Sequence, residues 1–315
     1  MLERLARQLG ESLQQDETLS AYVLIDPILR EPFTDDWLEA ESRHTWPVPV
    51  RHPLLKEGQL PRLIHLHPHD TRLLEASLAQ AVDEQADPDS ERTQGFAFGG
   101  WLLTAAPADA LVRHLARVMQ GGFWGQPSSQ LIRWADRRVM QWMWPVLTPA
   151  QQASLLGPVQ HWWSLDRCAQ LVLFQSVASP DPEAVRFSAD QWRHALKSET
   201  VHDLLRGWQR FADVLPADHL QQASRAADAV VAAGVLNRQD RVLLGAYVLQ
   251  VHPDLTTHPT VRRAIERAIE GDASLAEALD DIPDPQGWDA IRAELDLVFG
   301  PTSTIQQTAQ GEHLG

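Results

Sequence analysis

The sequence predicts an α+β or mixed α/β N-terminal lobe followed by a mostly α-helical C-terminal lobe. Short apolar runs typical of buried strands alternate with amphipathic helical patterns up to about residue 176. Residues 179–182 then have the composition of a linker, and beyond them only helical periodicity recurs. The expected parts are residues 1–178, residues 179–300 and a disordered tail at residues 301–315.

Composition and charge narrow the class of protein. A chain of 315 residues is long enough for one large or two modest domains with a buried core. Its formal net charge of −15 repels phosphate backbones, so no nucleic-acid partner is expected. The single cysteine excludes an intrachain disulfide, and the charged N-terminus lacks the apolar core of a signal peptide. With no apolar run that could span a bilayer, we expect a cytoplasmic protein without membrane contact.

The N-terminal lobe is expected to begin with a helix and several strands. Residues 1–18 place apolar side chains on one helical side. The apolar run at residues 21–25 predicts a buried strand, and residues 62–67 predict a second one. The proline-containing residues 46–50 predict an edge strand, where proline is tolerated. A third buried strand is expected at residues 96–103, where the glycines predict a bulge or a close backbone approach.

Helices are expected after the second and third of these buried strands. They should start at Thr71, as an N-cap, and at Pro107, because proline suits the start of a helix. The polar residues 83–94 show no apolar periodicity and are expected to form a loop. The glycine-rich residues 121–125 follow a helix, so they are expected to form its C-cap and a turn.

The segment of residues 130–163 is the best-specified local structure in the chain. Asp136 is a suitable N-cap for a helix, because its carboxylate can accept from the free amides of the first turn. Residues 148–151 (TPAQ) predict a second helix with a capping box and proline at its first position. Gly157 and Pro158 are expected to end that helix.

Two more strands and then a series of helices complete the expected fold. The strands are predicted at residues 159–163 and 169–174, and another capping box is predicted at residues 188–191. Apolar residues then recur at helical spacing. Two of the expected buried stripes are Val201, Leu204, Leu205, Trp208 and Phe211, and Val242, Leu243, Ala246 and Tyr247.

His65 and His67 are the most enzyme-like feature. Two histidines at i and i+2 near a strand end point the same way and could ligate a metal, which gives the alternative of a metal-dependent hydrolase. Such a site needs further ligands and an activated water, and the sequence offers no recognised set. The favoured interpretation is a strand end that enters a polar loop. The chain also lacks a nucleophile elbow, a phosphate-binding loop and a dinucleotide fingerprint, so we expect no enzyme activity, no cofactor and no metal.

Arg133, Asp136 and Arg138 form a charged group at the start of the first helix in residues 130–163. They could bind an anion or take part in catalysis. Ion pairing across a strand–helix corner is the commoner outcome, because a partly buried arginine needs a carboxylate partner. We therefore expect a structural role for them.

The sequence contains twelve tryptophans, which indicates either a bulky core or a surface that binds a partner. Those between Trp134 and Trp163 are too closely spaced for all of them to point inward. Trp142 lies off the apolar stripe of its helix and is expected to be an exposed anchor. The candidates for partner binding are Trp142, Trp144, Trp162 and Trp124.

Several of these segments together carry a family resemblance. The chain resembles the type VI secretion effector chaperones, also called adaptors (the TEC/Tap group). The most recognisable segment is residues 133–139, which has Arg137 where that family usually places proline. The other resembling segments are residues 22–26, 60–66, 100–104, 114–115, 156–159, 163, 187–191 and 251–253.

The resemblance implies a non-enzymatic cytoplasmic chaperone. Such proteins bind a cognate secreted effector and help to load it onto the secretion spike, a VgrG or PAAR protein, in some cases with a co-chaperone. The family signature in this chain comprises Arg133, Asp136, Arg138, Gly157 and Pro158, and its role is expected to be structural.

Overall fold

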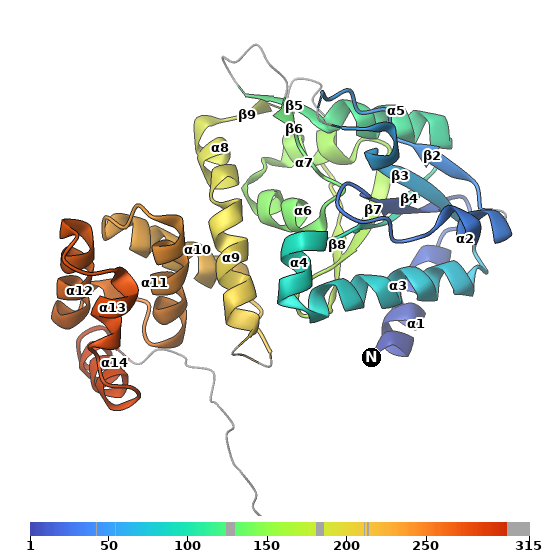
Figure 1. Cartoon of the computed structure of the whole chain (residues 1–315). Helices are drawn as coiled ribbons and strands as arrows, with labels where there is room; N and C mark the ends of the chain where they lie inside the picture. Colours follow the sequence, from blue (N-terminus) through green and yellow to red (C-terminus); the bar gives the residue numbers. More distant parts are fainter. Residues whose placement is uncertain are drawn as a thin grey trace, which may run out of the picture. The chain divides into compact units, whose positions relative to one another are not determined.

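The structure of the protein is a computed structural model that describes residues 1–41, 43–53, 55–123, 130–180, 186–210, 212 and 214–300. Trp124, Phe211 and the predicted tail at residues 301–315 lie outside the described residues. The chain divides into two compact units, Met1–Ser198 and Glu199–Gly315 (Figure 1). The predicted α+β lobe and the helical part after it are confirmed. The first unit extends past the boundary expected at residues 178/179, which stays a prediction.

A six-stranded sheet forms the centre of the first unit. Its strand order is β2-β3-β1-β4-β7-β8, and all neighbouring strands are antiparallel. The strands expected from the apolar runs are therefore present, and β2 and β8 form the two edges. Their bounds are Ser20–Ile25 (β1), Thr45–Pro47 (β2), Arg62–Leu66 (β3), Phe98–Thr104 (β4), Val159–Leu165 (β7) and Leu171–Phe174 (β8).

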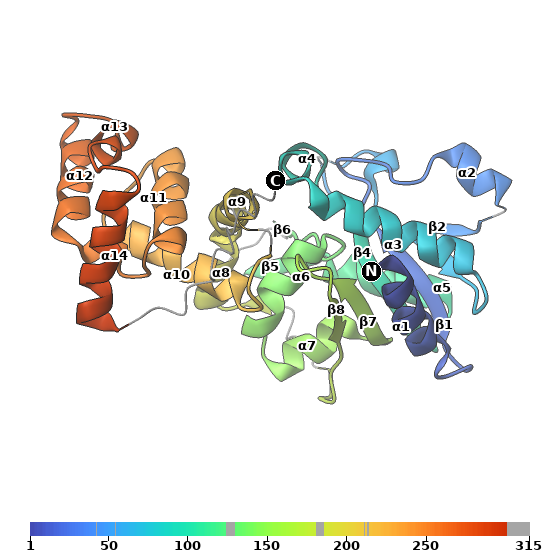
Figure 2. The ribbon, with the colours of Figure 1, turned by 90° about the horizontal axis from the view of Figure 1, so that it is seen from below.

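Helices and loops bury both faces of this sheet. On one face, Val23, Ile64 and Trp101 pack with α1 (Leu2–Gln14), α2 (Asp35–Ala40) and α3 (Thr71–Ala86). Figure 2 shows α1 and α3 close together beside the sheet. The alternate residues on the other face are also inaccessible to solvent: Leu24, Leu63, Leu102 and Trp162. This double burial explains why the residues of the central strands β1 and β4 are nearly all apolar.

The glycines of β4 make the close backbone contacts that the sequence predicted. The pairing of β4 with β1 shifts register between Leu24 and Ile25. Gly100 has a φ of 143°, and a Cβ there would lie 2.1 Å from the carbonyl oxygen of Trp163. A Cβ at Gly99 would lie 2.5 Å from the carbonyl oxygen of Ala135. Side chains at both positions would therefore separate β4 from its neighbours.

Two expectations for the segment after β3 are wrong. α3 has Asp70 as its N-cap, whose carboxylate accepts from the amide of Leu73, so Thr71 is the first helical residue. Residues 83–94 are not a loop, because α3 continues to Ala86 and α4 spans Pro88–Gln94. α4 has no apolar stripe, and its buried contact is made by a carboxylate, Glu91, that forms ion pairs.

The glycine-rich stretch after α5 (Ala108–Val118) is another correction. Its described part is a strand, β5 (Gln120–Phe123), and not the expected turn. β5 pairs antiparallel with β6 (Gln130–Leu131) and parallel with β9 (Arg186–Phe187). A Cβ on Gly121 would lie 2.0 Å from Cδ1 of Ile132. The glycine thus permits close packing within a strand.

The helix signals in residues 130–163 are confirmed. Asp136 caps α6 (Arg137–Met143) through the amide of Arg138, at 3.0 Å. Thr148 and Gln151 form the capping box of α7 (Pro149–Leu156), which ends at Gly157 with a φ of 53°. The capping box at the start of α8 (Ala189–Leu196) is also present. The described part of this unit also contains two short 3-10 helices, Glu57–Gln59 (η1) and Trp144–Val146 (η2).

The second unit is helical throughout its described part. Its elements are α9 (Ser198–Gln209, whose first residue belongs to the first unit), α10 (His219–Ala232), α11 (Arg238–Gln250), η3 (Leu255–Thr257), α12 (Pro259–Glu270), α13 (Leu275–Asp280) and α14 (Gln286–Phe299). The buried face of α11 differs from the predicted stripe. It consists of Leu244, Gly245 and Val248, because Gly245 lets Leu204 of α9 approach closely. Each described helix of the chain is too short or too polar to cross a membrane.

Candidate functional site

The charged residues of the family signature, Arg133, Asp136 and Arg138, lie in a largely buried group of charges that we name the arginine corner. It brings together the end of β1, α3, α4, the start of α6 and the turn between β7 and β8. Its carboxylates are Asp26, Glu84, Glu91 and Asp136, and its guanidinium groups are Arg30, Arg133, Arg137, Arg138 and Arg167.

Asp136 connects two of these arginines. Its Oδ2 lies 2.6 Å from Nη2 of Arg138 and 3.7 Å from Nη2 of Arg133. Burial alone raises the pKa of Asp136, but the charge and hydrogen bonds of Arg138 and the charge of Arg133 outweigh burial and hold this pKa far below its ordinary value. Asp136 is therefore ionised at every physiological pH.

Asp26 and Glu91 extend the ion pairs in two directions. Nη2 of Arg133 lies 2.8 Å from Oδ2 of Asp26, at the end of β1. Burial raises the pKa of Asp26, and Asp136 raises it further, while Arg133 opposes the change. On the other side, Oε1 of Glu91 receives Arg138 at 2.9 Å and Arg167 at 2.6 Å. A continuous set of charges thus joins β1 to α4 and to the β7–β8 turn.

Arg137 is the most buried arginine of the corner, with 2% exposure. Its Nη1 lies 2.8 Å from Oε2 of Glu84, and its Nη2 donates to the carbonyl oxygen of Ala81 at 2.7 Å. The guanidinium carbon lies 4.1 Å from the ring centroid of Phe96, within range of a cation–π contact. The sequence marked Arg137 only as a departure from the family pattern, because the buried carboxylate that stabilises it lies more than fifty residues earlier, in α3.

The arrangement of the arginine corner favours a structural role. Each guanidinium group has a carboxylate partner, and each carboxylate has at least one guanidinium partner. Against the effect of burial, the pKa of Asp136 is held far below its ordinary value by Arg138 and Arg133, and the pKa of Arg138 is raised by Asp136 and Glu91, so this pair stays charged near neutral pH. Gly157 has a packing role outside the arginine corner, since a Cβ there would lie 2.1 Å from Cε1 of His114.

The tryptophans are mainly core residues. Six of those that the structure describes are buried: Trp101, Trp134, Trp142, Trp162, Trp208 and Trp288. Five others are half-buried: Trp37, Trp46, Trp144, Trp163 and Trp192. The excess of tryptophan therefore serves the bulky core at least as much as any surface for a partner.

The expected exposure of Trp142 is wrong. Its side chain is buried, its ring stacks on His194 of α8 with centroids 3.8 Å apart, and its Nε1 donates to the carbonyl oxygen of His194 at 3.0 Å. The stripe of one helix does not reveal that a second helix, fifty residues later, covers its other side. Trp162 is fully buried and donates to Gly99 within the sheet. Trp144 is half-buried beside Phe174, so it stays a prediction for partner binding, and Trp124 lies outside the described residues.

His65 and His67 come together as the strand spacing predicts, with ring centroids 4.2 Å apart. His65 is half-buried, and burial, followed by the nearby His67 and His44, lowers its pKa. Among the described residues, no group of three or more His, Cys, Asp or Glu side chains could hold a metal ion. Asp70, the carboxylate next in the chain, is already paired with Arg43 and caps α3. A ligand set for a hydrolase is therefore not assembled in this part of the chain.

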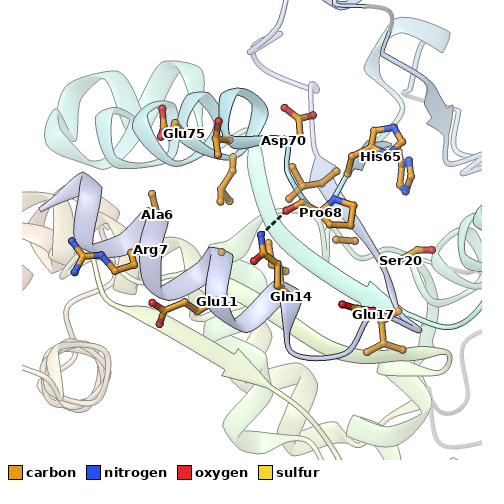
Figure 3. A pocket seen from close by; sticks show the side chains of 18 of the residues that line it. Ala6, Arg7, Glu11, Gln14, Glu17, Ser20, His65, Pro68, Asp70 and Glu75 are labelled. Carbon is orange, nitrogen blue, oxygen red and sulfur yellow. Dashed lines mark hydrogen bonds between the residues drawn. The ribbon is translucent and has the colours of Figure 1, made fainter.

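A groove of about 600 Å³ lies between α1 and the start of α3 (Figure 3), and the sequence analysis did not predict it. Its floor includes the buried residues Leu13, Leu66 and Leu74. Gln14, near the end of α1, donates to the carbonyl oxygen of Pro68 in the loop after β3, as the dashed line in Figure 3 shows. The carboxylates that line the groove are Glu3, Glu11, Glu17, Asp70 and Glu75. The groove forms between segments more than fifty residues apart, so no local pattern predicts it.

The fold and this packed corner define a non-repetitive α+β lobe followed by a helical unit. Residues 21–154 match the model of a protein family described as a domain of unknown function (DUF4123). The match begins in β1, ends within α7 and includes Arg133, Asp136 and Arg138, while Gly157 and Pro158 follow it. Searches of curated proteins and of solved structures gave no match to this chain.

Proposed function

We propose that this protein is a non-enzymatic cytoplasmic adaptor that binds a type VI secretion effector and helps to load it onto the VgrG or PAAR spike. The observation that carries the proposal is the match of residues 21–154 to the DUF4123 family, which is associated with effector adaptors of this secretion system. The order of resembling segments along the sequence supports the same assignment.

The geometry supports a binding function better than a chemical one. The arginine corner holds its charged groups in ion pairs, so it stabilises the lobe on which a partner can bind. Half-buried tryptophans such as Trp144 and Trp46 offer aromatic surface, and the groove beside α1 offers a concave one. Interfaces concentrate their energy in a few aromatic or arginine anchors, so these are the first places to look for contacts.

Co-expression tests the proposal. The tagged full chain is produced together with the products of its neighbouring genes and purified through the tag. We expect a toxin-like effector, a spike protein, or both to co-purify, in some cases with a co-chaperone. The tag alone, produced with the same gene products, is the control.

Two results would contradict the proposal. One is that the chain captures neither an effector nor a spike protein. The other is that the purified protein holds stoichiometric zinc by elemental analysis and loses it on His65→Ala, which would support the hydrolase instead.

A further inference from the structure

We propose that the groove between α1 and α3 binds a segment of a partner protein that carries Lys or Arg side chains next to aliphatic ones. This inference rests on the proposed adaptor function and names the chemistry that the partner would present. The groove lies within the first unit and is lined by α1, the start of β1, the end of β3 and the start of α3 (Figure 3).

The walls of the groove are strongly acidic. Glu11 projects from α1 and Glu75 from α3, so carboxylates stand on both sides (Figure 3). Five carboxylates line the groove, whereas Arg7 supplies the single guanidinium among the lining residues. Asp70 is neutralised by Arg43. Glu3, Glu11, Glu17 and Glu75 are solvent-exposed, and none of the four pairs with a basic side chain in the described part of the chain.

The floor of the groove is apolar, which separates it from an ordinary acidic surface. Leu13 and Leu74 are each 9% exposed and face the space between the helices. Gly10 also lines the groove, and a Cβ there would lie 3.5 Å from Cδ2 of Leu74, an ordinary contact distance. The absence of a side chain at Gly10 therefore leaves room above Leu74. An aliphatic side chain of a ligand would lose its water contact in this room.

The negative charge of the groove indicates which kind of segment it binds. Acidic walls attract Lys and Arg, and they repel phosphate groups and other acidic proteins. The segment of residues 301–315 contains neither Lys nor Arg, so this segment does not match the basic occupant. A second copy, with a formal net charge of −15, is repelled as well. A basic and apolar segment of a different protein fits both the walls and the floor.

Three model peptides test the groove by fluorescence anisotropy with the full chain at physiological ionic strength. One short labelled peptide contains Lys and Leu, a second contains Glu and Leu, and a third contains Lys and Ser. We expect the Lys–Leu peptide to bind at least about tenfold more tightly than the other two, because it alone satisfies walls and floor. Equal binding of the Lys–Ser peptide would overturn the apolar part of the proposal.

Variants of the chain locate the binding. Glu11→Lys combined with Glu75→Lys should weaken the Lys–Leu peptide about tenfold or more, since attraction becomes repulsion at two points. Asp83→Lys combined with Glu39→Lys is the matched control. It makes the same charge change at exposed residues of the same unit outside the groove, and it should leave the affinity within about twofold of wild type. Equal weakening by both variants would mean a general attraction to acidic surface and would contradict the proposal.

Gly10→Leu tests the floor without a change of charge. The added side chain fills the room above Leu74 and should weaken the Lys–Leu peptide about tenfold, while circular dichroism should still show a folded protein. If this variant does not fold, the charge-reversal pair decides by itself. Wild-type affinity in the charge-reversal pair would overturn the proposal.

The co-purification partner separates this inference from the proposed function. If an effector or spike protein co-purifies equally with wild type and with the Glu11→Lys/Glu75→Lys variant, the groove proposal fails and the adaptor function stands. If the peptides bind as expected but no effector or spike protein is captured, the adaptor function fails and the groove stands.

Discussion

The carboxylate of Asp136 caps the adjacent helix α6 and also belongs to the ion pairs of the arginine corner. Oδ1 accepts from the amide of Arg138 and so caps α6, while Oδ2 pairs with the guanidinium of the same residue. The first contact was predictable, because an N-cap lies beside the helix that it caps. The ion pairs of Arg138 with Glu91 and of Arg133 with Asp26 could not be predicted from the sequence, because these carboxylates lie 47 and 107 residues away in the chain.

The depressed pKa of Asp136 predicts how the loss of stability caused by its substitution depends on pH. Its folded pKa lies below the ordinary value of 3.8, so its ionised form contributes stability above that pH, and this contribution is lost as the pH falls toward the folded pKa. Asp136→Asn should lower the free energy of unfolding by about 3 kcal/mol at neutral pH, because it leaves the half-buried guanidinium groups of Arg133 and Arg138 with less compensation. Denaturant titrations over a pH series should show this difference shrinking below pH 3.8.

Asp190→Asn is the control for that measurement. Asp190 pairs with Arg193, but their side chains are 83% and 75% exposed, so the loss should stay below about 1 kcal/mol. The quantity to follow is the difference in the free energy of unfolding between each variant and wild type. Acid unfolding of wild type alone is not sufficient, because burial raises the pKa of Asp26, so the contribution of Asp26 to stability has the opposite pH dependence. An equal loss in both variants, or a loss for Asp136→Asn that persists unchanged in acid, would refute this account of the corner.

At the scale of elements, α7 and α4 show two different ways to specify a short helix. α7 carries its own signals, a capping box, a proline at its first position and a glycine at its end. α4 also has a cap, Asp87, and an N-terminal proline, but it lacks an apolar stripe. Its inward residue is Glu91, which is stable there because Arg138 and Arg167 reach it from later parts of the chain. The capping signals therefore predicted α7, whereas α4 was missed because residues 83–94 show no apolar periodicity.

The capping box of α7 gives a prediction with a closely matched control. Thr148→Ala removes the hydroxyl that accepts from the amide of Gln151 and should lower the free energy of unfolding by about 1 kcal/mol. Thr148→Ser keeps the hydroxyl and should cost at most a few tenths of that value. Chemical denaturation of the full chain measures both, and a serine variant as unstable as the alanine variant would show that the hydroxyl is not the stabilising group.

At the scale of the whole molecule, the first compact unit ends later in the chain than the sequence suggested. The linker-like residues 179–182 suggested a boundary at 178/179, whereas the compact unit runs to Ser198 and includes β9 and α8. The contacts explain this extent. Phe187 of β9 is buried beside Trp134, and Gln191 of α8 donates to the carbonyl oxygen of Val146 at 2.8 Å and shares hydrogen bonds with Gln151.

Truncation distinguishes the two boundaries. A fragment of residues 1–198 should unfold cooperatively and at a higher temperature than a fragment of residues 1–178, because the shorter one loses β9 and α8 and uncovers Trp134 and Trp142. Thermal unfolding followed by tryptophan fluorescence measures both. If the two fragments unfold at the same temperature with the same native spectrum, the boundary at 178/179 is the better one.

The sequence by itself determined the local features of this protein. The buried strand at residues 21–25, the caps Asp136 and Thr148 and the stop at Gly157 all depend on neighbours within a few residues, so they are readable from the chain. The tertiary structure decided which charged and aromatic side chains are buried. Arg137 and Glu91 are stable inside because distant partners neutralise them, and Trp142 is covered by a helix that follows much later. Burial of such groups depends on contacts between segments far apart in the chain, and these contacts exist only once the fold has formed.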